Sequence, residues 1–128
     1  KKLTLLTVLI FSLMFSSTSF ADWTKVSSSG GGANTFYVDF ERIRKHGGYV
    51  YYWTLSDYLK PNFDGDLSSK GYYQGDCKLF RFKFLSYVHH KQPMGRGPGD
   101  SNSPKNPEWV YPSPNSVDEF ILKSVCSR

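Results

Sequence analysis

The residues best suited to chemistry are a row of cations and aromatic rings near the middle of the chain. Arg81 and Lys83 alternate with phenylalanines, and Tyr87 follows them in the same segment. An earlier aromatic segment offers Tyr51 and Trp53 in a second alternating row. Arginine and large aromatic side chains are enriched at binding surfaces. These five residues are therefore predicted to form a binding face for acidic glycans or acidic protein patches. An ordinary solvated strand surface is the alternative.

The sequence contains no constellation typical of catalysis, of a metal ion or of a cofactor. The histidines are His46, His89 and His90, and adjacent residues of a strand point to opposite faces, so His89 and His90 do not share one ion. No serine lies in a Gly-x-Ser-x-Gly motif. The glycines at 95, 97 and 99 lack the helix and the Gly-Lys-Ser/Thr ending of a phosphate-binding loop. We predict no catalytic residue, no metal and no cofactor, and hence a binding protein rather than an enzyme.

The start of the chain predicts export. Lys1 and Lys2 precede a short apolar run, and Ser19-Phe20-Ala21 resembles a signal-peptidase site. We therefore predict a signal peptide at 1–21, with an uncleaved anchor as the alternative, and a single domain at 22–128. No cysteine stands at the cleavage point, and no later segment is apolar enough to span a membrane. The predicted location is the periplasm, the cell surface or the medium, without a lipid anchor.

Charge and cysteine content agree with an exported domain. The chain has 16 Lys and Arg against 11 Asp and Glu, a net charge of +5, which permits acidic partners. Export and this modest charge argue against nucleic acid. Its two cysteines, Cys77 and Cys126, are expected to pair in an oxidising compartment. A redox-active pair is disfavoured because no Cys-x-x-Cys motif is present.

A sheet and one helix must position these residues. In the segment Cys77–Lys91, Phe80, Phe82 and Phe84 alternate with the two cations, which predicts a central strand with one buried face. Ser116 and Glu119 form a capping box that begins a helix over Ser116–Val125. Val117, Phe120, Ile121 and Val125 are predicted to share its apolar face. Cys77 shares the face of the cations, so it requires a bulge or a position before the regular pairing, unless the helix crosses the end of the strand.

Other segments complete an α+β fold: one antiparallel sheet of about six strands carrying a C-terminal helix. The pair Gly47-Gly48 predicts a tight hairpin. The remaining strands are predicted at Ala21–Ser27, Thr35–Val38, Tyr49–Tyr58, Leu67–Tyr73 and, as a short edge strand, Glu108–Tyr111. Between these elements, Gln92–Pro107 reads as a long exposed loop.

Several segments, in order over nearly the whole mature chain, resemble the surface-adhesin protein E family of small exported bacterial proteins. They are Asp22–Val26, Tyr37–Asp39, Ile43–Lys45, Tyr49–Leu55, Leu67–Lys70, Asp76–Lys78, Arg81-Phe82, Leu85–Tyr87, Pro93–Gly95, Glu108-Trp109 and Pro114–Cys126. The resemblance implies a mainly antiparallel sheet with a C-terminal helix and a Cys77–Cys126 disulfide. It also implies adhesion, the binding of host matrix proteins or cell surfaces.

The predicted function is accordingly an exported, adhesin-like binding module for host matrix proteins or acidic glycans. A periplasmic or envelope interaction protein is the alternative, with a small hydrolase as the third possibility. Tyr49, Tyr51 and Trp53 form one row of the aromatic strand, and Val50, Tyr52 and Thr54 form the other. One short helix does not cover both rows, so a partner, such as a second copy of the chain, is expected to contact the uncovered row.

Overall fold

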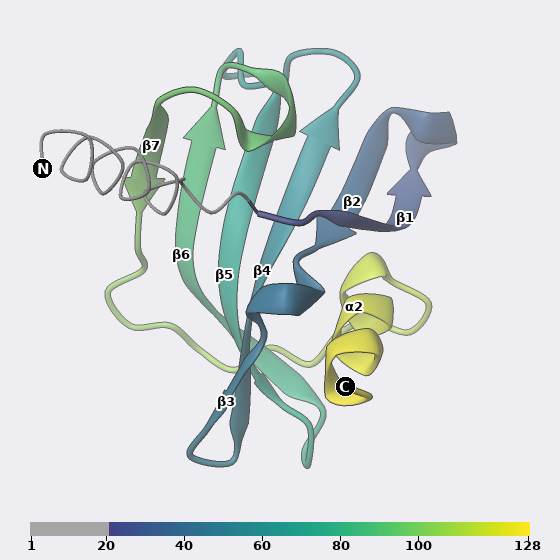
Figure 1. The fold of residues 1–128 in the computed structure, drawn as a ribbon, viewed down its shortest axis with the longest axis vertical. Coiled ribbons are helices and arrows are strands. Elements are labelled where there is room, and N and C mark those ends of the chain that lie inside the picture. The colour runs from purple at the N-terminus through teal and green to yellow at the C-terminus, as the bar shows by residue number, and fades with distance from the viewer. Residues whose placement is uncertain (1–20) are drawn as a thin grey trace, which may run out of the picture.

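A computed structural model describes residues 21–128, and the predicted signal peptide lies outside the described residues except for Ala21. The fold is one antiparallel sheet of seven strands with a C-terminal helix, which confirms the predicted α+β class (Figure 1). The strands are β1 (Thr24–Ser29), β2 (Asn34–Val38), β3 (Arg44–His46), β4 (Tyr49–Tyr58), β5 (Ser68–Asp76), β6 (Arg81–His90) and β7 (Gly99–Asn102). Their order is β1-β2-β4-β5-β6-β7, and β3 pairs with the free part of the β4 edge beyond β2.

The three long strands β4, β5 and β6 form the centre of the sheet (Figure 1). In β4 the alternating sequence gives one buried side and one half-exposed side, and in β6 Phe82 is buried between the half-exposed Arg81 and Lys83. The β3–β4 hairpin turns at Gly47 and Gly48, whose φ angles of +60° and +83° are readily adopted by glycine. The predicted Gly-Gly hairpin is therefore confirmed.

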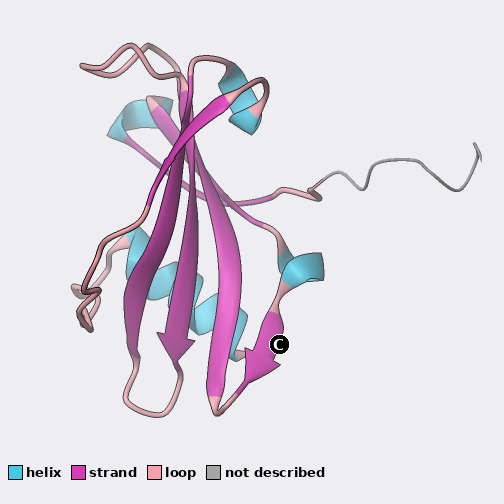
Figure 2. Cartoon of the chain, turned by 90° about the vertical axis from the view of Figure 1, so that its left-hand side faces the viewer, coloured by secondary structure: helices cyan, strands magenta, loops and turns pink. Residues whose placement is uncertain are grey.

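One face of the sheet is covered by helix α2 (Val117–Cys126), which Figure 2 shows alongside the strands. Ser116 Oγ accepts a hydrogen bond from the Glu119 backbone N–H at 3.1 Å, so the predicted N-cap is confirmed. The core beneath α2 comprises Val38, Val50, Tyr52, Phe82, Ile121, Leu122 and Val125. The predicted apolar face of the helix was wrong at Phe120, which is 51% exposed, while Leu122 is fully buried.

Cys77 and Cys126 form the predicted disulfide, which ties the β5–β6 turn to the end of α2. The regular strand begins only at Arg81, so the predicted strand start at Cys77 was wrong. Phe80 has a φ of +53° and belongs to the turn, not to the phenylalanine row. Cys77 therefore precedes the regular pairing, which resolves the conflict between its strand face and the position of the helix.

The segment predicted as the Gln92–Pro107 loop contains more structure than expected. Two of the backbone N–H groups of the short helix η3 (Pro93–Gly95) donate hydrogen bonds to side chains of β4 and β5. Met94 N–H donates to Asp57 Oδ1 at 2.7 Å, and Gly95 N–H donates to Ser68 Oγ at 2.8 Å. Strand β7 then pairs with β6. The predicted edge strand at Glu108–Tyr111 is only a bridge between Phe82 and Val110, since Pro112 and Pro114 prevent its extension. Among residues 21–128, no helix has the length and apolarity to cross a membrane.

Candidate binding face

The face of the sheet opposite α2 carries the candidate binding residues, and we call it the outer face. In β4 the residues Val50, Tyr52 and Thr54 point toward the helix side, so Tyr51 and Trp53 point outward. The β4–β5 register places Tyr72 opposite Trp53, so Tyr72 points outward as well. The β5–β6 register adds Arg81 and Lys83 of β6 to the same face. We define the outer face by Tyr49, Tyr51, Trp53, Tyr72, Arg81 and Lys83.

The rings of the outer face contact one another across the strands. Trp53 and Tyr72 have ring centroids 4.7 Å apart, and Tyr51 and Tyr72 lie 6.2 Å apart. These separations are typical of favourable aromatic pairs. Each ring is half-buried, and α2 packs on the opposite face of the sheet. The outer face therefore presents a preformed aromatic surface.

Two cations complete the lower part of this face. The guanidinium of Arg81 lies 4.3 Å and the ammonium of Lys83 lies 4.5 Å from the ring centroid of Trp109. The same indole lies 5.5 Å from Tyr49, so it joins the two cations to the aromatic row. Cation–π contact fixes the positions of both charges while leaving them half-exposed.

Arg81 is also anchored by the β5–β6 turn. Its Nε donates to Asp76 Oδ2 at 2.9 Å, and the other oxygen of Asp76 accepts the backbone N–H groups of Lys78 and Leu79, each at 3.1 Å. The hydrogen bond from Leu79, followed by those from Arg81 and Lys78, holds the pKa of Asp76 below its usual value, although burial opposes the shift. Arg81 consequently has a structural role in addition to its position on the face.

Tyr87 does not lie with the other predicted residues. The β5–β6 register changes from Tyr73 opposite Phe84 to Tyr72 opposite Ser86, which leaves Leu85 as a bulge. An extra residue reverses the facing of every later side chain in the strand. Tyr87 therefore lies on the helix-covered side, 5.2 Å from Phe84, whereas Arg81, Lys83, Tyr51 and Trp53 share the outer face.

Two residues of this surface, Trp109 and Tyr72, were not predicted. Trp109 follows a proline-rich segment without periodicity, and only its tertiary position brings it over the two cations. Tyr72 lies in the predicted strand Leu67–Tyr73, whose residues were not assigned to either face of the sheet. Arg44 pairs with Tyr51 in register and so shares its face. The alternation of β4 and β5 could have identified Tyr72, but no local signal indicates Trp109.

Comparison with known proteins places the chain in a family. The family model for surface-adhesin protein E matches residues 23–127. The chain belongs to the surface-adhesin protein E family. Membership supports an adhesin-like binding protein, exported or located at the surface, rather than an enzyme. No curated protein sequence matches the chain significantly.

Solved structures of Haemophilus influenzae protein E have the same fold. Crystal form II is 14% identical over 87% of this chain and 94% of that chain, with a TM-score of 0.59. The structure of protein E from non-typeable Haemophilus influenzae is 12% identical over 88% of this chain and 79% of that chain, with a TM-score of 0.58. At these identities the similarity extends to the fold.

The other residues considered from the sequence are dispersed in this member of the family. His46 pairs with Tyr49 at one end of the sheet, and His89 and His90 lie near the other end on opposite faces. In the part of the chain that the structure describes, no group of three His, Cys, Asp or Glu side chains is arranged to hold a metal ion. The disulfide lies at the turn end of the sheet and holds α2 against the helix-covered face.

Proposed function

We propose that this protein is an exported binding module whose outer face contacts acidic polymers on a host surface, such as sulfated glycans or acidic patches of matrix proteins. The observation that carries the proposal is the position of Arg81 and Lys83 over Trp109, beside an aromatic row on the face of the sheet opposite α2. Oriented cations beside large rings provide both attraction and contact area for an acidic partner.

The distribution of charge supports an acidic rather than a basic partner. Arg44, Arg81 and Lys83 all point to the outer face, and the acid directly opposite Arg81 is Asp76, which is buried and already paired with it. The basic residues therefore dominate what an approaching polymer meets on this part of the face. Such attraction should weaken with salt, because the screening length falls to about 8 Å at physiological ionic strength.

The test is binding to immobilised heparin, measured by surface plasmon resonance at several salt concentrations. Arg81 is left intact because its removal would disturb the Asp76 turn. Arg44→Glu with Lys83→Glu should weaken binding by at least roughly tenfold, since two attractive charges become repulsive. The matched control is Lys60→Glu with Lys105→Glu, which makes the same change in net charge at two exposed residues of other loops. Equal binding by both variants would exclude the outer face as the site.

Location decides between the proposed role and an envelope role. Recovery of the folded protein at the cell surface or in the medium favours host contact. Strict periplasmic residence favours an interaction protein of the envelope, which is the alternative function. Light scattering of the purified protein shows whether a second copy pairs with the first, and the Arg44→Glu, Lys83→Glu variant shows whether such pairing uses the outer face.

A further inference from the structure

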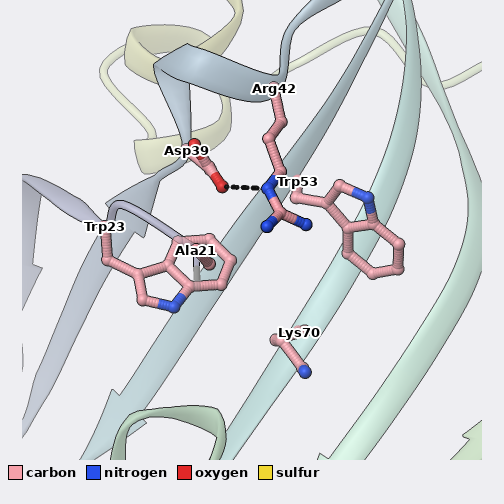
Figure 3. A pocket seen from close by; sticks show the side chains of 6 residues that line it. All are labelled: Ala21, Trp23, Asp39, Arg42, Trp53 and Lys70. Atoms are coloured by element: carbon pink, nitrogen blue, oxygen red, sulfur yellow. Dashed lines mark ion pairs between the residues drawn. The ribbon is translucent and has the colours of Figure 1, made fainter. Parts of the chain in front are cut away.

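Above the aromatic row, the outer face contains a hollow between two tryptophans. The segment before β1 crosses β4 in Figure 1, and Trp23 from this segment lines the hollow together with Trp53 (Figure 3). The hollow has a volume of about 170 Å³, and its lining within the predicted mature domain consists of Trp23, Asp39, Arg42, Trp53 and Lys70; Ala21, the last residue of the predicted signal peptide, also lines it. It opens into a wider groove of about 690 Å³ bounded by Met94, Arg96 and the glycines of the η3 turn. We call the smaller space the tryptophan hollow.

The side chains of the tryptophan hollow combine flat rings with positive charge. Figure 3 shows the indoles of Trp23 and Trp53 on either side of the Arg42 guanidinium, with Lys70 beyond them. Trp53 contacts Tyr72 of the neighbouring strand, with ring centroids 4.7 Å apart. Arg96 adds a third cation in the adjoining groove. An occupant with one flat apolar face and one negative charge would match both features.

Arg42 is positioned by an unusual carboxylate. Asp39 is completely buried, and within residues 21–128 neither of its side-chain oxygens accepts a hydrogen bond. Its nearest charged partner is Arg42, whose Nε lies 3.3 Å from Oδ2. A buried carboxylate of this kind strongly favours a nearby cation. Asp39 is therefore a positioning residue that keeps the Arg42 guanidinium at the hollow.

The two cations of the hollow also act on each other. Burial, followed by the charge of Arg42, lowers the pKa of Lys70 from its ordinary value. Two like charges on one small hollow raise each other's electrostatic energy, and among its described lining residues the one carboxylate, that of Asp39, is paired with Arg42. A bound anion would relieve this repulsion, which is a physical reason for the hollow to select a negative group.

We propose that the tryptophan hollow binds one acidic sugar, a pyranose ring that carries a carboxylate. The C–H faces of the ring pack against Trp23 and Trp53, and the carboxylate pairs with Arg42 and Lys70. This proposal rests on the proposed function, because it assigns one unit of an acidic glycan to a defined place on the outer face. The lower cations Arg44 and Lys83 then attract the polymer, and the hollow recognises a single residue of it.

The experiment follows tryptophan fluorescence of the purified protein during titration with glucuronic acid, with glucose and acetate as separate probes of the ring and the charge. Glucuronic acid should give a saturable change with a dissociation constant on the order of millimolar, as expected for a ligand of this size. Glucose and acetate should each bind at least roughly tenfold more weakly, because each lacks one of the two matched features. Equal binding of glucose, or no saturation by glucuronic acid, overturns the proposal.

Variants connect the signal to the hollow. Lys70→Gln should weaken glucuronic acid binding by roughly tenfold. It removes no ion pair among residues 21–128, so the variant should retain the fold, and circular dichroism verifies this. Arg44→Gln, on the outer face but outside the hollow, should leave glucuronic acid binding unchanged while weakening heparin binding. An unchanged affinity in Lys70→Gln overturns the assignment to the hollow.

The two proposals fail in different ways. Heparin binding that depends on Arg44 and Lys83, without saturable binding of glucuronic acid, overturns the sugar site and leaves the proposed function standing. Glucuronic acid binding that is lost in Lys70→Gln, without any heparin binding, supports the sugar site and overturns the wider polymer-binding face.

Discussion

The two faces of strand β4 are built from nearly the same residue types and yet have different surroundings. Tyr52 points under α2 and is 2% exposed, whereas its neighbour Tyr51 points outward and is half-buried by other rings. On the helix-covered face, the ring of Tyr73 stacks on that of Tyr52 with centroids 5.3 Å apart, and aliphatic side chains such as Leu122 complete the core around them. On the outer face, aromatic and cationic side chains lie around Tyr51.

This difference separates stability from binding within one sheet. The core beneath α2 is almost inaccessible to water, so its residues contribute to the free energy of unfolding. The outer face leaves ring surface and charge accessible, and it thereby retains contact area that a partner can bury. A sheet of alternating strands performs both tasks because each strand contributes one residue in two to each face.

The largest expected effect comes from replacing each of two adjacent tyrosines, which point to opposite faces, by alanine. Tyr52→Ala should lower the free energy of unfolding by about 3–5 kcal/mol, because it opens a cavity beneath α2. Tyr51→Ala should cost about 1 kcal/mol or less, since its ring is only half-buried. Heparin binding should show the reverse order, with the Tyr51 variant more strongly impaired. Urea unfolding and surface plasmon resonance measure the two quantities.

Equal destabilisation by the two substitutions would show that the outer rings contribute to the core as much as the helix-covered face does. To separate loss of the ring from loss of the hydroxyl group, Tyr51→Phe is the matched control, and it should retain nearly all of the stability.

Removal of the disulfide tests whether this bond keeps α2 packed on the helix-covered face of the sheet. Cys77→Ser with Cys126→Ser should lower the free energy of unfolding by about 4 kcal/mol, because the bond closes a loop with a sequence separation of 49 residues. The parent protein in dithiothreitol should unfold at the same urea concentration as the double variant. A variant as stable as the oxidised parent would mean that packing alone retains the helix.

The smallest effect concerns the turn that anchors Arg81 on the outer face. Since the pKa of Asp76 is lowered in the folded state, its charge stabilises the fold above the ordinary pKa near 3.8 and this stabilisation is lost as the pH falls through the lowered pKa. Asp76→Asn retains an oxygen for the turn but has no charge to titrate. Its thermal stability should therefore decline less steeply with acid below about pH 4 than that of the parent.

Thermal melts across an acid series measure this difference, with Asp100→Asn as the control at an exposed aspartate for which no comparable contacts are found. Parallel curves for the parent and Asp76→Asn would show that the turn hydrogen bonds do not favour the charged carboxyl group.

The sequence by itself determined the elements whose signal is local. Alternation specified β4 and most of β6, the Gly-Gly pair specified the hairpin, and Ser116 with Glu119 specified the start of α2. The pairing of the cysteines followed from their number and from the predicted export. Each of these features depends on residues adjacent in the chain or on composition, so no knowledge of distant contacts was required.

The tertiary structure decided which residues meet. A one-residue bulge at Leu85 places Tyr87 on the opposite face from the one predicted. Alternation assigns each side chain of a strand to a face of the sheet only where the pairing register is unbroken. Trp109 reached Arg81 and Lys83 through the bridge of Val110 to Phe82. Trp23, Arg42 and Lys70 converge on one hollow from three separate segments. Contacts between segments distant in sequence depend on strand order and on the path of the connecting chain, neither of which is encoded in a local pattern.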